Sequence, residues 1–112
     1  MALLTATSVP GGTAVNVTPA TVSSSDTISA SDIGRFGVLV RVTNGGGSAI
    51  TATIADPGKT AVGNAGTTAA QSVPASQSRY LRVLPGHVNP ATGVATITFS
   101  GTTSVTAELV RG

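Results

Sequence analysis

The stretch from Arg35 to Pro57 most strongly constrains how this chain folds, because its apolar residues alternate with polar ones at the two-residue period of a β-strand. The inward-facing sets are Phe36, Val38, Val40 and Val42, followed by Ile50, Ala52 and Ile54. Between them, Asn44 to Ser48 contains three glycines, which tolerate the positive φ angles of tight turns. The pattern predicts a β-hairpin in the middle of a β-sandwich, with the valines, isoleucines and Ala52 in its core.

The rest of the chain repeats this alternation in shorter pieces. Strand-like segments occur at Thr13–Thr18, around Ile28, at Arg79–Leu84, at Val94–Phe99 and at Val105–Leu109. Ser100-Gly101-Thr102 predicts a second hairpin turn, between the last two strands. About seven or eight short strands with glycine or proline at nearly every joint, and no amphipathic helix, are typical of an all-β fold, a single β-sandwich of jelly-roll or Greek-key topology. We expect an extended N-terminal arm over residues 1–12 and the β-sandwich domain over residues 13–112.

Two interpretations of residues 1–12 remain open. Leu3 and Leu4 form a short apolar patch, and Pro10-Gly11-Gly12 ends any regular element. The segment is either a first edge strand or frayed terminus of the sandwich, or an arm that pairs with a neighbouring molecule by strand addition, since two leucines on a terminus favour burial.

The composition restricts both the core and the surface. Aromatic residues make up only 3% of the chain, so we expect a thin core of small, β-branched side chains. Such a core stabilises an isolated monomer only marginally, and oligomerisation or docking onto a larger surface would add burial. Charged residues make up 9%, against about 25% in an ordinary domain. The solvent-facing surface is therefore expected to consist largely of hydroxyl groups.

Charge and cysteine content exclude several classes of partner and site. The sequence pI is near 10.0, but the net charge is only +2 and the basic residues are spread along the chain, so we expect no nucleic-acid partner. The absence of cysteine excludes disulfide scaffolds and thiolate zinc sites and is compatible with a reducing cytoplasm. The N-terminus has no charged region followed by a sustained apolar run, so we expect no signal peptide and no membrane partner.

Few residues could carry catalytic chemistry. His87 is the only histidine, and its loop between two prolines predicts an exposed or interface side chain. Asp26 and Asp32 are placed to accept nearby backbone amides in turns, and no Asp-rich loop of the calcium-binding type surrounds them. Glu108 stands alone on the last strand, where an arginine across the sheet is its expected partner. We predict no enzyme activity, no catalytic or metal-binding residues and no cofactor.

The segment Arg79–Leu84 is the best candidate for an interaction surface. It carries apolar side chains on both faces, which suits a strand whose outer face is partly covered by a loop or a partner. Arginine and tyrosine are favoured at protein interfaces. The candidate interface residues are Arg79, Tyr80 and Arg82 of this strand, with Ala2, Leu3 and Leu4 of the arm.

The order of these features resembles a known family. The resemblance lies in DIGRFGVLVRVTN, the following Gly-Gly-Gly-Ser turn, ITATI, VPASQSRY and the closing GVATITFSGTTSVTAELVR. It covers nearly the whole chain, in pattern and composition, without a diagnostic motif. The chain resembles the small β-sandwich proteins of tailed bacteriophage virions, particularly head decoration or cement proteins.

The resemblance implies a non-enzymatic structural protein of the virion, made in the cytoplasm of the host bacterium and located on the outer capsid surface. It also implies that the major capsid protein is the partner, that trimers form at three-fold positions, and that the protein staples neighbouring capsid subunits and so stabilises the capsid. Two alternatives remain open. One is another virion β-domain, of the head-completion, tail-tube or fibre-associated kind, and the other is a carbohydrate- or cell-surface-binding module.

Overall fold

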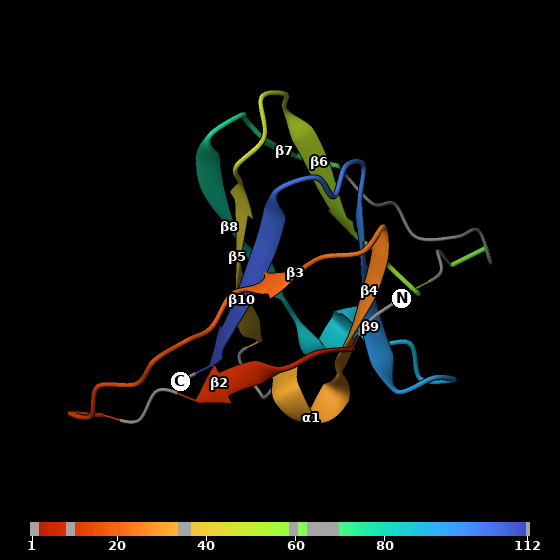
Figure 1. The fold of residues 1–112 in the computed structure, drawn as a ribbon. Coiled ribbons are helices and arrows are strands. Elements are labelled where there is room, and N and C mark those ends of the chain that lie inside the picture. Colours follow the sequence, from red (N-terminus) through yellow and green to blue (C-terminus); the bar gives the residue numbers. More distant parts are fainter. Residues whose placement is uncertain (1–2, 9–10, 34–36, 59–60, 63–69, 112) are drawn as a thin grey trace.

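The computed structural model describes residues 3–8, 11–33, 37–58, 61–62 and 70–111, which form two β-sheets facing each other (Figure 1). The strands are β1 (Leu3–Leu4), β2 (Ala6–Ser8), β3 (Ala20–Thr21), β4 (Ser25–Ser29), β5 (Val38–Asn44), β6 (Ile50–Ile54), β7 (Gln71–Val73), β8 (Gln77–Val83), β9 (Val94–Phe99) and β10 (Val105–Arg111). Two short helices accompany them, α1 (Ala30–Ile33) and the 3₁₀ helix η1 (Pro85–His87).

Sheet A has the strand order β1-β4-β9-β6-β7, and sheet B has the order β2-β10-β5-β8, with β3 also paired to β10. The β1–β4 and β2–β10 pairs are parallel, and the remaining pairs are antiparallel. The predicted all-β sandwich is confirmed. The described residues contain more strands than the expected seven or eight, because several edge strands are only two or three residues long and show no periodicity in the sequence.

The predicted hairpin over Arg35–Pro57 is wrong in its pairing. β5 lies in sheet B between β10 and β8, whereas β6 lies in sheet A between β9 and β7. The turn predicted at Ser100-Gly101-Thr102 likewise joins β9 of sheet A to β10 of sheet B. Both connections are therefore corners between sheets. The sequence pattern missed this because alternation specifies which side chains are buried, and an in-sheet hairpin and an inter-sheet corner bury the same ones.

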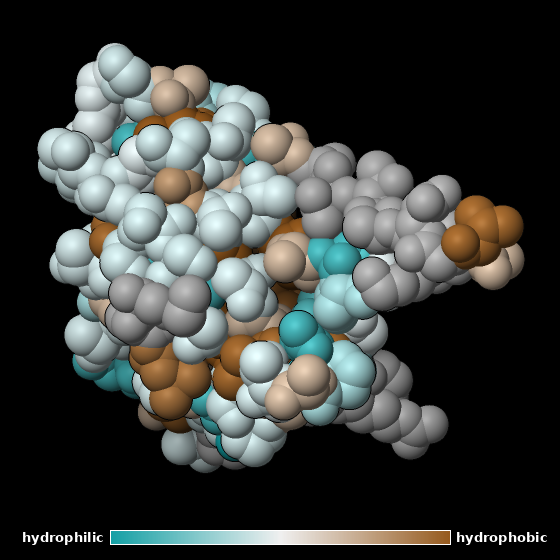
Figure 2. Space-filling model, turned by 90° about the vertical axis from the view of Figure 1, so that its right-hand side faces the viewer, coloured by the Kyte–Doolittle hydropathy of each residue, from teal (hydrophilic) through white to brown (hydrophobic). Residues whose placement is uncertain are grey.

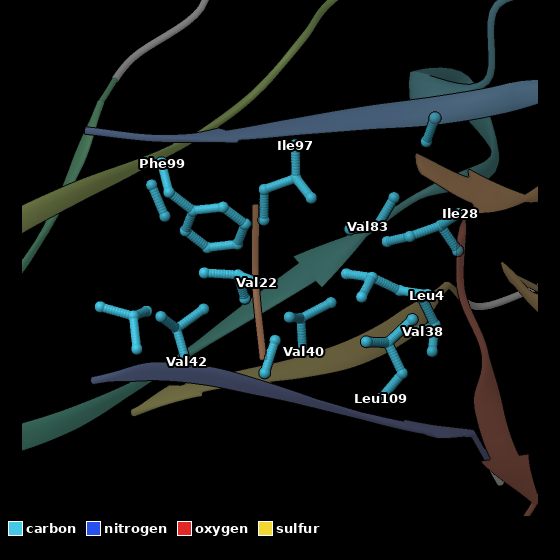
Figure 3. Packing of buried hydrophobic residues seen from close by; sticks show 14 of the residues in the cluster. Leu4, Val22, Ile28, Val38, Val40, Val42, Val83, Ile97, Phe99 and Leu109 are labelled. Atoms are coloured by element: carbon cyan, nitrogen blue, oxygen red, sulfur yellow. The ribbon is translucent and has the colours of Figure 1, made fainter. Parts of the chain in front are cut away.

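The predicted core faces are confirmed, since Val38, Val40, Val42 and Ala52 are fully buried. Ile50 and Ile54 are partly buried and pack against the same cluster. Figure 3 shows Ile97 and Phe99 of β9 pointing across the sandwich toward the valines of β5. Phe99 is the one aromatic residue in the described core, while Phe36 lies outside the described residues. The layer between the sheets is thus built mainly from small aliphatic side chains, as the composition predicts.

The N-terminal segment belongs to the sandwich itself. Leu3 and Leu4 pair with β4, and the next strand, β2, pairs with the end of β10, so one short segment joins an edge of sheet A to an edge of sheet B. Leu4 is only 3% exposed and packs in the core. The described part of residues 1–12 therefore matches the edge-strand interpretation and not a free arm, and Ala2 lies outside the described residues.

Truncating Ile97 tests the packing of this layer. Ile97 is fully buried at the centre of the cluster, so Ile97→Ala is expected to lower the free energy of unfolding by about 2–5 kcal/mol. Val62→Ala is the matched control, because Val62 is 84% exposed and its truncation should change stability by less than about 0.5 kcal/mol. Urea unfolding followed by circular dichroism measures both. Equal effects of the two substitutions would contradict the assigned core.

Candidate interaction surface

Strand β8 is the longest edge strand among the described residues. It pairs with β5 along its whole length, from Val83 opposite Val38 to Gln77 opposite Asn44, and has no described strand on its other side. The other sheet edges are formed by strands of two or three residues. An edge of seven residues presents a row of main-chain N–H and C=O groups that a further strand can bind.

The outer face of sheet B consists of three cross-strand rows. One row is Ser78, Thr43 and Thr106, the next is Tyr80, Arg41 and Glu108, and the third is Arg82, Leu39 and Val110. The Thr43 and Ser78 hydroxyl oxygens lie 3.0 Å apart. The face therefore changes from hydroxyl groups at one end, through a charged and aromatic row, to partly apolar groups at the other.

The middle row contains an ion pair. Arg41 Nη1 donates to Glu108 Oε1 at 3.2 Å, which confirms the arginine expected opposite Glu108. The pair is partly exposed, so its contribution to stability is about 0.2–1 kcal/mol. The pair also restrains the side chains of Arg41 and Glu108 in the row that contains Tyr80. Because their charges are opposite, that row has little net charge.

The structure places two of the three β8 candidates, Tyr80 and Arg82, on one face of sheet B and the third, Arg79, on the other. Tyr80 is 68% exposed on the outer face, and Arg82 is exposed on the same face one row away. Arg79 lies on the other face, where it is also exposed, and its guanidinium donates to the Ser78 carbonyl at 2.8 Å and to Gln77 Oε1 at 2.7 Å. On the outer face Tyr80 thus has Arg82 as its neighbour along the strand, while Arg79 points from the opposite face of the same edge.

The N-terminal candidates are not part of this surface. Leu3 is 58% exposed, but it lies on β1 at the end of sheet A opposite to β7, the strand that contacts β8. Leu4 was expected at an interface and is instead buried in the core of its own chain, because its pairing with Ile28 turns the side chain inward. The structure therefore separates the two sets of candidates that the sequence analysis combined.

Gly37 is a contributor that the sequence analysis missed. Its φ angle is +87°, and a Cβ atom there would lie 2.6 Å from the Val83 carbonyl oxygen and 3.1 Å from Cγ of Arg82. Only glycine allows the start of β5 to pass this close to the end of β8. The glycine is visible in the sequence just before a strand, but its partner in space is not.

The remaining polar candidates have structural roles. Asp26 is buried and accepts hydrogen bonds from the amide and the hydroxyl of Ser23, in agreement with the predicted local role. Asp32 was also expected to accept hydrogen bonds from amides close to it in sequence. Instead, its Oδ2 accepts a hydrogen bond from the distant amide of Ala6 at 3.3 Å, and its Oδ1 lies 3.9 Å from Arg111 Nη1. His87 Nδ1 accepts the amide of Leu84 at 2.9 Å. These side chains hold loops and the N-terminal segment in place.

The described ranges contain neither a cluster of metal-ligating side chains nor a membrane-spanning helix. No three His, Cys, Asp or Glu side chains gather there in a way that could hold a metal ion. None of the helices in these ranges has the length and apolar character needed to cross a membrane.

A depression of about 410 Å³ lies between the two inter-sheet corners. It is lined by glycines, hydroxyl groups, the amide of Asn44 and two apolar side chains, Ala49 and Ile50. No ionisable side chain lines it, so it offers no group for acid–base chemistry.

Comparison with known proteins finds no match among protein-family models, curated proteins or solved structures. A functional conclusion for this chain therefore depends on the geometry of β8 and on the resemblance in sequence pattern to phage head proteins.

Substituting Gly37 tests the close approach that supports this surface. Gly37→Ala is expected to destabilise the protein by about 1 kcal/mol or more, because alanine disfavours the positive φ and its methyl group meets the Val83 carbonyl. Gly47→Ala is the matched control, since a Cβ there meets nothing within 4 Å. Thermal unfolding compares the two variants. The assigned contact fails if Gly37→Ala is as stable as the control.

Proposed function

We propose that this protein is a non-enzymatic structural component of a bacteriophage virion, which binds the outer surface of the head and joins neighbouring major capsid subunits. The main support is Tyr80, which is 68% exposed at the middle of the longest sheet edge among the described residues, with Arg82 exposed on the same face. Exposed tyrosine and arginine are the residues most often found at the energetic centre of protein interfaces.

The setting of Tyr80 suits a binding anchor. Its strand is held along its whole length by β5, and the Arg41–Glu108 pair fixes the next positions in the same row. A tyrosine buries about 150–250 Å² when covered, and it loses little conformational entropy because it has few rotatable bonds. A rigid sheet that carries one such ring can bind a partner without rearranging.

The opposite face of the sandwich is almost uncharged. Most outward positions of sheet A are hydroxyl residues, among them Ser25, Thr27, Thr53, Thr96 and Thr98. Figure 2 views the molecule from the side on which β4 and β9 lie in Figure 1, and most of this face has the pale colour of near-neutral hydropathy. Such a surface carries few charges to desolvate, which favours close packing of many copies on a particle.

Binding to heads of the phage that encodes this chain tests the proposal. Tyr80→Ala is expected to weaken binding by about 10-fold or more, because truncation of an interface anchor commonly costs at least about 2 kcal/mol. Thr98→Ala is the control, since Thr98 is exposed on the outer face of sheet A. Occupancy per head, counted by electron microscopy, gives the affinity of each variant. Unchanged occupancy with Tyr80→Ala would contradict the role of this edge, and failure of the unmodified protein to bind heads would contradict the proposed function.

A further inference from the structure

Residues 11–19 leave the sandwich and return to it without joining either sheet. They lie between β2 and β3 and extend away from the body, at the left of Figure 1. All are exposed except Val17, which is half-buried. No hydrogen bond links them to one another or to the rest of the described chain. Polar main-chain groups of this segment are therefore left to solvent.

The sequence of this segment is nevertheless that of a strand. Thr13–Thr18 reads Thr-Ala-Val-Asn-Val-Thr, and threonine and valine are among the residues most enriched in strands. Val15 and Val17 alternate with Ala14 and Asn16, which gives the apolar stripe of a half-buried strand. Yet Val15 is 38% exposed. The strand that the sequence predicts over Thr13–Thr18 has no partner among the described residues of its own chain.

The same chain also carries a sheet edge that no other described strand covers. Strand β8 spans seven residues, or about 23 Å, and the segment Thr13–Thr18 would span about 20 Å when extended. β8 lies at one edge of sheet B, whereas β2 and β3, which flank the projecting segment, pair with β10 toward the other edge. The segment and β8 thus lie on opposite sides of sheet B, which favours pairing between copies.

We propose that Thr13–Thr18 adds as a further strand to β8 of a second copy of this chain. The contact is head-to-tail, since one copy supplies the projecting segment and the other supplies the edge. Contacts of this kind close into a ring when the rotation between copies allows it. A closed ring of three copies would form a trimer. In such a ring every Thr13–Thr18 segment and every β8 edge would be paired.

Charge and side-chain direction are compatible with this pairing. Thr13–Thr18 contains no charged residue, so it meets Arg79 and Arg82 without repulsion. Strand addition uses main-chain groups at the edge, and Tyr80 and Arg82 would remain on the outer face of the enlarged sheet. The Ser78 carbonyl accepts from the Arg79 guanidinium, so a partner strand that uses this carbonyl would replace that bond. Because the added strand would bind the main-chain edge and leave Tyr80 exposed, this inference does not depend on the proposed binding to capsids.

The absence of cysteine allows a direct cross-linking test. Val15→Cys protein is mixed with Tyr80→Cys protein and treated with a short bifunctional maleimide. We expect cross-linked pairs that contain one copy of each variant. The control mixture pairs Val15→Cys with Thr98→Cys, whose thiol would lie on the outer face of sheet A. Equal cross-linking in both mixtures, or none in either, would overturn the proposal.

Light scattering of the unmodified protein over a range of concentrations gives the second test. We expect assemblies of the 10.9 kDa chain that Val15→Pro/Val17→Pro weakens by at least about 10-fold, because proline removes N–H donors from the added strand. Val15→Thr/Val17→Thr should retain assembly, since threonine also favours strands. Both variants should unfold like the unmodified monomer, because the segment makes no hydrogen bond to any described residue of its own chain.

The outcomes separate this inference from the proposed function. A protein that stays monomeric at every concentration, or proline variants that assemble normally, would overturn strand addition between copies. Cross-linking of Val15→Cys only to a capsid subunit on heads would also overturn it, because the occupant of the segment would then be another protein. Loss of assembly in the proline variants with head binding retained would support the inference and leave the proposed function standing.

Discussion

The side-chain amide of Asn44 joins the two sheets at the corner where the chain leaves β5. Asn44 is 1% exposed, and its Nδ2 donates to the carbonyls of Ser48 at 2.8 Å and Val73 at 3.1 Å. Its Oδ1 accepts the amide of Gly46 at 3.0 Å. Because Val73 belongs to β7 of sheet A, this one side chain connects the end of a sheet B strand to the opposite sheet. Leaving such a group buried without partners would cost about 1–3 kcal/mol, which favours one geometry of the corner.

The core fills the space between the two sheets that Asn44 connects. Valine, alanine and isoleucine fill the space between the sheets, and Phe99 is the one large ring among the described core residues. The sequence predicts this layer well, because alternation identifies Val38, Val40 and Val42 and places Glu108 on an outer face opposite an arginine. Alternation does not assign strands to sheets. The corner at Asn44 therefore looks like a hairpin turn in the sequence, and the contact of Gly37 with Val83 requires knowledge of which strands are neighbours.

The segment Thr13–Thr18 also shows that alternation in the sequence does not determine strand pairing. Its residues predict a strand, but strand formation needs a partner, and none of the described strands lies beside it. Residues 3–8 show the reverse case, since they are too short for a periodic pattern and still pair with both sheets. Thus the sandwich is complete without the projecting segment and ends in an edge at β8, and its proposed functions rest on these two unpaired main-chain elements and on Tyr80.

Amide hydrogen exchange of the dilute monomer most directly tests the claim that the sandwich is folded while the segment Thr13–Thr18 is unpaired. The account predicts that amides of β5 and of β10, which are flanked by strands on both sides, exchange slowest, through global unfolding. Amides of Val15 and Val17 should exchange at the rate of an unstructured peptide, because none of the described residues accepts a hydrogen bond from them. Strong protection of Val15 and Val17 in the dilute monomer would show that the segment is already paired, and would contradict the account.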